Sequence, residues 1–178
     1  MTGDEMVPTT QGTLTIHQAT AADVDAAVAI EESAALWVRD RGYDPGLPPM
    51  PFRALFAGVI ARGRLYLALL DGMPAGKIAL SMNDPVVWPE ADADALYVHG
   101  LMVHRDFAGK QVGRAMLDWA ERRARAARKR FVRLDCMAEN PELRAYYERA
   151  GFVARGELAL PHRTAARYEK PVASEEET

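Results

Sequence analysis

The sequence lacks several features that would define a class of protein at once. It has one cysteine, Cys136, in 178 residues, which excludes an internal disulfide framework and a clustered cysteine metal site. It has no apolar run near the ~20 residues that a membrane-spanning helix needs. The first residues, MTGDEMVPTTQG, lack the basic and then apolar segments of a signal peptide. We therefore predict a cytoplasmic protein with no membrane partner.

An excess of positive charge is also missing. The formal net charge is −3, from 22 basic and 25 acidic residues, which disfavours a nucleic-acid-binding protein. One basic cluster keeps that class as a remote alternative; it consists of Arg122, Arg123, Arg125, Arg128, Lys129, Arg130 and Arg133. Helical spacing spreads these charges over more than one face, and no aromatic residues alternate with them. The four histidines show no metal-binding spacing. We therefore predict no nucleic-acid partner and no metal.

The composition that remains is that of an ordinary globular protein. Hydrophobic residues make up 49% of the chain and charged residues 26%. At this length one domain is the default, with a core large enough to fold without disulfides. We predict a flexible tail over residues 1–12, a single domain over 13–172 and an acidic tail over 173–178.

Hydrophobic periodicity and turn signals predict mixed secondary structure. We expect helices over residues 20–33, 52–61, 112–128 and 141–150, with a capping signal at Asn140-Pro141-Glu142 and a glycine stop at Gly151. We expect strands over residues 14–17, 65–70, 75–82, 96–103, 131–136, 152–160 and 167–172, and an Asp71-Gly72 hairpin turn. Proline-bearing loops separate them at residues 42–51 and 83–94. The hairpins exclude a purely parallel sheet, so the pattern predicts an α/β fold with a mixed sheet.

The most informative stretch is LYVHGLMVHRDFAGKQVG, residues 96–113. An apolar strand leads through a charged turn into a glycine-bearing loop, and a long helix follows directly. The loop amides at a helix start have no carbonyl partners, and the helix dipole adds positive potential there. This arrangement predicts an anion site, which we interpret as the binding site for a coenzyme pyrophosphate. An ordinary strand-to-helix turn is the alternative, because short glycine motifs are weak signals alone.

Together with the downstream segments RLDCMAEN and LRAYYERAGF, this stretch resembles the GCN5-related N-acetyltransferase (GNAT) family. The resemblance spans roughly residues 14–172 and is most specific over 96–156. It implies a mostly antiparallel six- to seven-stranded central sheet flanked by about four helices. It also implies acetyl-CoA as co-substrate and acetyl transfer to an amine. The family's loop frame falls on Ala108, Gln111 and Gly113; only Gly113 fits it, and Gln111 stands where the family has glycine.

The resemblance also implies roles for individual positions. Exposed backbone of the 101–103 strand would pair with the pantetheine arm, and one of its amides would polarise the thioester carbonyl. Tyr147 falls on the family's tyrosine, which returns a proton to the leaving thiolate; a core aromatic is the alternative. Asn140 would cap its helix and bond the coenzyme arm. The predicted coenzyme-binding residues are Leu101, Met102, Val103, Ala108, Gly109, Lys110, Gln111, Val112, Gly113, Arg114, Asn140 and Tyr147.

The acceptor amine must lose a proton before it attacks, because an ammonium has no lone pair. His99 is our candidate for the base, since it lies on the central strand and imidazole titrates near neutrality. A hydrogen-bonded core histidine is the alternative, and the loop acids Glu90, Asp92 and Asp94 are other candidates. By analogy with the family's variable loops, we expect the acceptor pocket to be walled by Trp37, Tyr43, Phe52 and Trp88.

These observations predict an acetyl-CoA-dependent N-acetyltransferase that moves the acetyl group directly to a primary amine of a small molecule or peptide. Cys136 ends an internal strand with no histidine beside it in the sequence, so we expect an inert thiol rather than an acyl carrier. The main alternative is an acyl-CoA-binding sensor or structural protein of the same fold without catalysis. The chain is expected to be a monomer or a homodimer.

Overall fold

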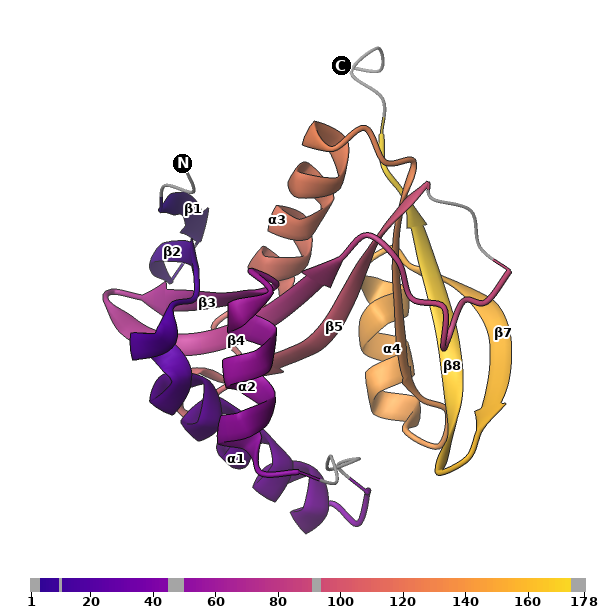
Figure 1. Ribbon diagram of the computed structural model, residues 1–178, viewed down its shortest axis with the longest axis horizontal. Coiled ribbons are helices and arrows are strands. Elements are labelled where there is room, and N and C mark those ends of the chain that lie inside the picture. The colour runs from indigo at the N-terminus through magenta and orange to yellow at the C-terminus, as the bar shows by residue number, and fades with distance from the viewer. Residues whose placement is uncertain (1–3, 10, 45–49, 91–93, 174–178) are drawn as a thin grey trace. The chain divides into compact units, whose positions relative to one another are not determined.

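A computed structural model describes residues 4–9, 11–44, 50–90 and 94–173 (Figure 1). The strands are β1 (Glu5–Thr9), β2 (Gly12–Gln18), β3 (Leu65–Leu70), β4 (Met73–Ser81), β5 (Ala95–Val103), β6 (Phe131–Met137), β7 (Val153–Leu160) and β8 (Arg163–Pro171). The α-helices are α1 (Val24–Asp40), α2 (Phe52–Ala61), α3 (Val112–Ala126) and α4 (Pro141–Arg149), and two short 3₁₀ turns are η1 (Ala21–Asp23) and η2 (Arg105–Phe107).

The strands follow the order β1-β2-β3-β4-β5-β6-β8-β7 in a mostly antiparallel mixed sheet. The predicted fold class is therefore confirmed, but the described sheet has eight strands rather than six or seven. The additional strand is β1, which pairs antiparallel with β2 through Glu5↔Ile16 to Thr9↔Gly12. The prediction of a flexible tail over residues 1–12 is therefore wrong for residues 5–9. Polar composition concealed a strand whose Val7 side chain is buried.

The chain divides into two compact units that alternate along the sequence. The first unit holds Met1–Ala79 and Gly100–Met116, and the second holds Leu80–His99 and Leu117–Thr178. The predicted single-domain span of 13–172 stays a prediction. The predicted acidic tail over 173–178 lies, apart from Ala173, outside the described residues.

In the first unit, antiparallel pairing runs from β1 through β2 and β3 to β4. The turn between β3 and β4 is the predicted hairpin, since Asp71 (φ 51°) and Gly72 (φ 80°) are both left-handed, as this two-residue turn requires. Helices α1 and α2 lie side by side (Figure 1). Their apolar faces form a core with β3, which includes Ala27, Ile30, Phe56, Leu65 and Leu67.

In the second unit, β5 and β6 pair in parallel through Ala95↔Phe131, Leu96↔Val132 and Tyr97↔Arg133. Strand β8 pairs antiparallel with both β6 and β7. Helix α4 begins as predicted: the Asn140 side chain accepts a hydrogen bond from the Leu143 amide at 3.0 Å. It ends at Arg149; Gly151 just beyond it is left-handed (φ 90°), and the Phe152 amide donates to the Tyr147 carbonyl at 3.1 Å.

None of the helices in the described ranges is both long and apolar enough to cross a membrane. The cytoplasmic location stays a prediction.

Candidate active site

The predicted pyrophosphate loop lies in the first unit, between η2 and α3. Two backbone turns shape it, with the Ala108 amide donating to Arg105 and the Lys110 amide to Phe107, at 3.1 and 3.2 Å. Gly109 is left-handed (φ 78°), and a Cβ atom added there would meet no described atom within 4 Å. Open space at a left-handed glycine lets a ligand approach the backbone closely.

Gln111 also adopts a left-handed conformation, with φ 60°. The backbone therefore takes a glycine-like conformation at the position where the family has glycine, although a residue with a side chain adopts it only at a cost. The first bond of α3 runs from the Ala115 amide to the Gln111 carbonyl, at 2.9 Å. Amides of the first helical turn have no intrahelical acceptor, and the dipole is positive there. The loop therefore has the backbone amides and positive potential that suit an anion, and its coenzyme-binding role stays a prediction.

A buried ion pair lies beside Gly100 of β5, which directly precedes the predicted coenzyme segment. The Lys77 ammonium is 2.6 Å from a Glu31 carboxylate oxygen and donates to the Gly100 carbonyl at 3.0 Å. Burial lowers the pKa of Lys77, and the Glu31 carboxylate acts in the opposite direction. The lysine thus fixes Gly100, which is left-handed (φ 53°), directly before the predicted pantetheine segment 101–103. Sequence reasoning missed this pair, because Lys77 falls within an otherwise apolar strand.

Tyr147 is buried in the second unit among aromatic rings. Its ring centroid lies 5.4 Å from that of Tyr146, 6.0 Å from Phe152 and 6.1 Å from Tyr168. Burial raises the pKa of the Tyr147 phenol, and Cys136, Tyr146 and Asp135 raise it further. The phenol is therefore protonated at neutral pH, as a proton donor must be, but it is a weaker acid than a free tyrosine. Its catalytic role stays a prediction.

Cys136 is buried in β6, and burial raises the pKa of its thiol to about 12. A thiol with this pKa is almost entirely protonated at neutral pH, whereas the thiolate is the nucleophile. The chemistry of this site therefore supports the expectation of an inert cysteine. Direct transfer of the acetyl group to the amine does not require a cysteine that carries the acyl group.

His99 lies near the end of the second-unit part of β5 and is partly buried. Its Nε2 atom is 2.9 Å from the Ser81 hydroxyl oxygen, and that hydroxyl donates to the Asn83 carbonyl at 2.7 Å. Since the single hydroxyl proton of Ser81 is used in that bond, Ser81 accepts from Nε2–H. A neutral His99 therefore has its lone pair on Nδ1, as a general base requires.

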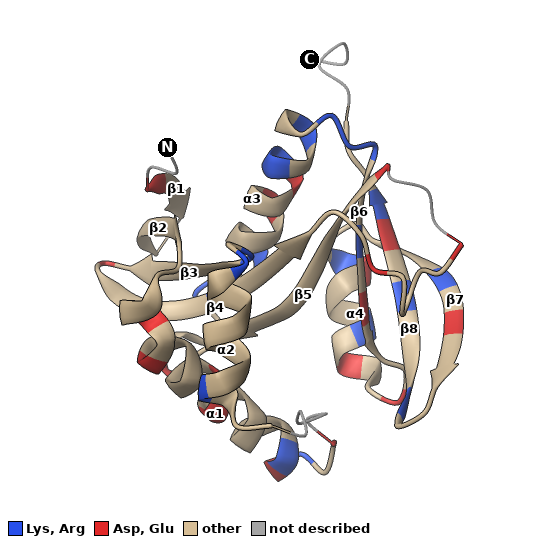
Figure 2. Cartoon of the chain, in the orientation of Figure 1, with Lys and Arg blue, Asp and Glu red and all other residues tan. Residues whose placement is uncertain are grey.

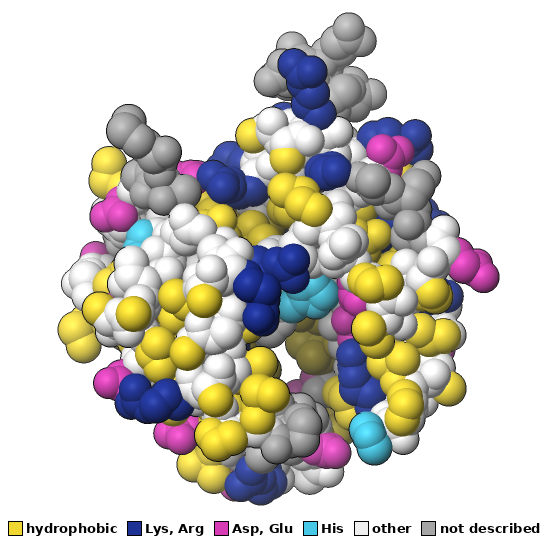
Figure 3. All heavy atoms as spheres, viewed as in Figure 1, with side chains coloured by type: hydrophobic (Ala, Val, Ile, Leu, Met, Phe, Trp, Pro, Cys, Tyr) yellow, Lys and Arg dark blue, Asp and Glu magenta, His cyan; other side chains and the backbone are white. Residues whose placement is uncertain are grey.

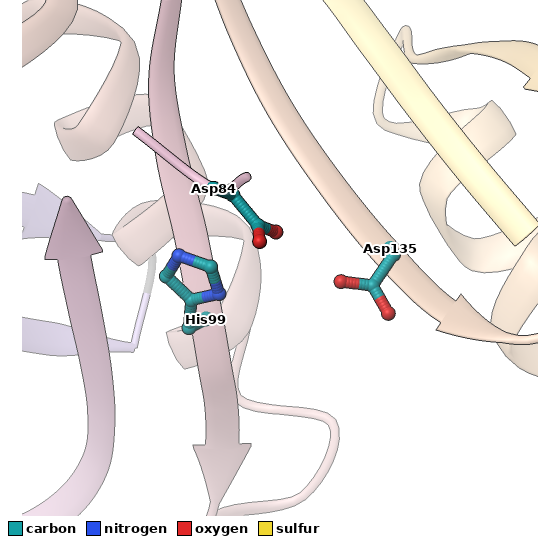
Figure 4. A group of neighbouring side chains, drawn as sticks. All are labelled: Asp84, His99 and Asp135. Atoms are coloured by element: carbon teal, nitrogen blue, oxygen red, sulfur yellow. The ribbon is translucent and has the colours of Figure 1, made fainter. Parts of the chain in front are cut away.

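Two carboxylates share the space beside His99. One ligand atom from each of Asp84, His99 and Asp135 lies within 4.8 Å of the others, and the three side chains point toward one another (Figure 4). Sequence reasoning missed both aspartates. The signal for Asp135 was strand alternation, which places it on one face of β6 with Arg133, but the register against β5 was unknown. The expectation of no metal stays a prediction, since this group could hold an ion.

The alternative bases are less well placed in the second unit. A carboxylate oxygen of Asp94 lies 3.4 Å from the Arg130 guanidinium, so this carboxylate is already engaged in an ion pair. Glu90 is exposed. Asp92 lies outside the described residues.

The expected acceptor-pocket residues have different surroundings. Trp88 is a core residue, packed with Tyr97 and Ala165. Phe52 packs on the core of the first unit. The guanidinium groups of Arg41 and Arg105 lie 4.3 and 4.0 Å from the ring centroid of Trp37. Tyr43 is partly exposed.

Figure 2 shows basic residues at the end of α3 and in the segment that follows it, and members of this basic cluster pair with acidic residues. Arg133 is buried and pairs with Glu169 at 2.7 Å, and Arg125 pairs with Glu121 at 3.5 Å. On the face shown in Figure 3, basic side chains lie in separate small groups. This distribution does not resemble the stripe of basic charge that is typical of nucleic-acid-binding proteins.

The mixed sheet and the glycine-bearing loop before α3 are the features from which the sequence predicts a coenzyme-binding α/β protein. Comparison with known proteins makes the class specific: the model of the acetyltransferase (GNAT) family matches residues 33–152. The chain therefore belongs to the GNAT family, as the sequence predicted, and is an acyltransferase. Members of this family use acetyl-CoA.

Individual relatives agree with this assignment. The chain is 29% identical over 146 residues to the uncharacterized N-acetyltransferase YesJ of Bacillus subtilis, covering 78% of this chain and 79% of YesJ. A GNAT-family acetyltransferase from Streptococcus agalactiae has the same fold, with a TM-score of 0.79 at 18% identity, covering 94% of this chain and all of that one. The PaiA N-acetyltransferase from Thermoplasma acidophilum, solved in complex with coenzyme A, gives a TM-score of 0.69 at 14% identity, with coverages of 89% and 98%.

Proposed function

We propose that this protein transfers an acetyl group from acetyl-CoA directly to a primary amine of a small molecule or peptide. The observation that carries the proposal is the pair of hydrogen bonds that links His99 through the Ser81 hydroxyl to the Asn83 carbonyl. It fixes the lone pair of a candidate base on Nδ1, on a strand that continues toward the predicted coenzyme segment. The rest of the proposal follows from the family.

Each residue has a defined task in this reaction. His99 takes a proton from the acceptor amine, whose lone pair is then available. The loop from Ala108 to Arg114 holds the diphosphate through backbone amides, and the strand 101–103 holds the pantetheine arm. Asn140 caps α4 and bonds the coenzyme arm, and Tyr147 returns a proton to the thiolate.

Coenzyme binding is tested first, by the shift of the melting temperature with acetyl-CoA. Ligand that binds only the folded state adds about 2.7 kcal/mol of stability at a hundred times its Kd. We expect a concentration-dependent rise with acetyl-CoA and none with acetate. A protein that shows this rise but releases no thiol with any amine would be an acyl-CoA sensor, and a protein without the rise would contradict both functions.

A further inference from the structure

The parallel strands β5 and β6 bring His99 and Asp135 together. The last paired residues are Tyr97 and Arg133, and the Arg133 guanidinium donates to the Tyr97 hydroxyl at 3.1 Å. Side chains alternate along a strand, so the next residues on that face are His99 and Asp135. Asp84 reaches the same space from the loop that follows β4 (Figure 4).

Three acceptor atoms of the second unit therefore converge. The His99 Nε2–H group is bonded to Ser81, which leaves Nδ1 as the nitrogen that faces a ligand. Asp84 uses one oxygen to accept from the Val87 amide, at 3.2 Å. Asp135 uses one oxygen to bind Arg163, at 2.6 Å. Each carboxylate can offer its second oxygen to a ligand, and all three residues are partly exposed.

The chemistry of these acceptors suits a primary ammonium group, which has three N–H donors. Acceptors placed about 2.8 Å from a tetrahedral nitrogen lie about 4.6 Å from one another. The three atoms lie within 4.8 Å of one another, which accommodates this geometry. A zinc ion, with ligands about 3.4 Å apart, would satisfy the same limit, but it would place two positive charges rather than one beside the Arg163 guanidinium, which is bound to Asp135.

We propose that Asp84 and Asp135 bind the acceptor as its ammonium ion and present it to His99, so that the enzyme selects cationic primary amines. This inference rests on the proposed function. The ammonium gives one proton to Nδ1 of His99. The nitrogen lone pair then attacks the thioester carbonyl carbon, the carbon–sulfur bond breaks, and its electron pair leaves on sulfur. Tyr147 gives its phenol proton to that thiolate and regains a proton from the nitrogen, and His99 releases its proton to water.

The test compares amines that differ in charge at pH 7.5. Benzylamine, putrescine and L-lysine are ammonium ions at this pH, whereas aniline is neutral. Thiol release from acetyl-CoA is measured for the wild type, Asp84→Asn, Asp135→Asn and the control Glu139→Gln, which removes one exposed acid from the same unit. We expect Asp84→Asn to raise the KM for the best ammonium substrate at least tenfold, with a smaller change in kcat. Asp135→Asn should act in the same direction, and Glu139→Gln should stay within twofold.

Several results would overturn the inference. These are an unchanged KM in Asp84→Asn, equal KM changes for aniline and the ammonium substrate, or no turnover of any of the three ammonium probes. A zinc-dependent rise in melting temperature that Asp84→Asn abolishes would replace it with a metal site. The melting shift with acetyl-CoA is measured in every variant. If that shift persists while the KM prediction fails, the acceptor assignment is wrong and coenzyme binding stands.

Discussion

The glycine loop before α3 and the polar cluster around His99 take part in the proposed reaction by different means. The loop offers backbone amides, which every residue except proline carries, and its shape depends on left-handed residues at Gly109 and Gln111. The cluster offers side chains, so its chemistry depends on which residues are present. We therefore expect the backbone site to tolerate glutamine in place of glycine, and the cluster not to tolerate the loss of His99 or of its acids.

The largest expected effect is the loss of the buried Lys77–Glu31 ion pair, which holds Gly100 directly before the predicted pantetheine segment. Glu31→Gln leaves the Lys77 ammonium, whose side chain is 2% exposed, without its carboxylate partner. Removing one member of a buried ion pair costs about 3–5 kcal/mol of stability. Urea unfolding should show this loss, whereas Glu32→Gln, in an exposed neighbour, should change the free energy of unfolding by less than about 0.5 kcal/mol. Equal stability of both variants would mean that the pair does not hold β5.

The second effect separates catalysis from folding. His99→Gln removes the proton acceptor, and general-base catalysis contributes about 100-fold or more to the rate. We expect kcat to fall by about this factor while the melting shift with acetyl-CoA is retained. His162→Gln, at an exposed histidine in the β7–β8 turn, is the matched control. A fall of kcat by less than threefold in His99→Gln would assign the proton transfer to water or another residue.

A smaller effect is expected at Tyr147. Burial raises the pKa of its phenol, which makes it a weaker proton donor than a free tyrosine. Tyr147→Phe should lower kcat about tenfold, within the range of acid catalysis, and change the affinity for acetyl-CoA less than twofold. Tyr146→Phe removes the same group from the adjacent residue and should leave kcat within twofold. A large loss of coenzyme affinity in Tyr147→Phe would indicate a binding role instead.

The smallest effect tests the backbone site itself. Gln111→Gly removes a side chain from a left-handed position and should raise the free energy of unfolding by up to about 1 kcal/mol, without weakening acetyl-CoA binding. Gly109→Ala adds a side chain at a left-handed position and should lower the free energy of unfolding by about 1 kcal/mol. Thermal and urea unfolding, with and without acetyl-CoA, measure both. If Gln111→Gly weakens acetyl-CoA binding, the Gln111 side chain itself contacts the coenzyme.

The sequence predicted local structure well where the signal is local. Residues 52–61 match α2, Asp71-Gly72 forms the expected turn, and Asn140 caps α4. Strand β1 was missed because its sequence is polar and contains proline, and its stability comes from pairing with β2 rather than from its own pattern. Helix α1 runs to Asp40, beyond the predicted end at residue 33, because nothing in the sequence stops it there.

The candidate site was also predicted only in part, because some of its residues come together only through contacts between distant segments of the chain. His99 was chosen as a candidate from its place on one strand, and the loop from its glycines, and the roles of both stay predictions. Asp135 was missed because it meets His99 only through the register of β5 against β6, and Asp84 because it reaches His99 from the loop after β4; no local pattern encodes either. Lys77 and Glu31 are far apart in the sequence, and each alone resembles an ordinary charged residue.

The most direct test of the account is a stoichiometric assay of acetyl transfer. Wild-type protein is incubated with acetyl-CoA and each ammonium probe, and free thiol and N-acetylated amine are measured together by absorbance and mass spectrometry. The account predicts that both products form in equal amounts, only when an amine is present, and about 100-fold more slowly in His99→Gln. Thiol release without N-acetylated amine, or at the same rate in His99→Gln, would contradict it.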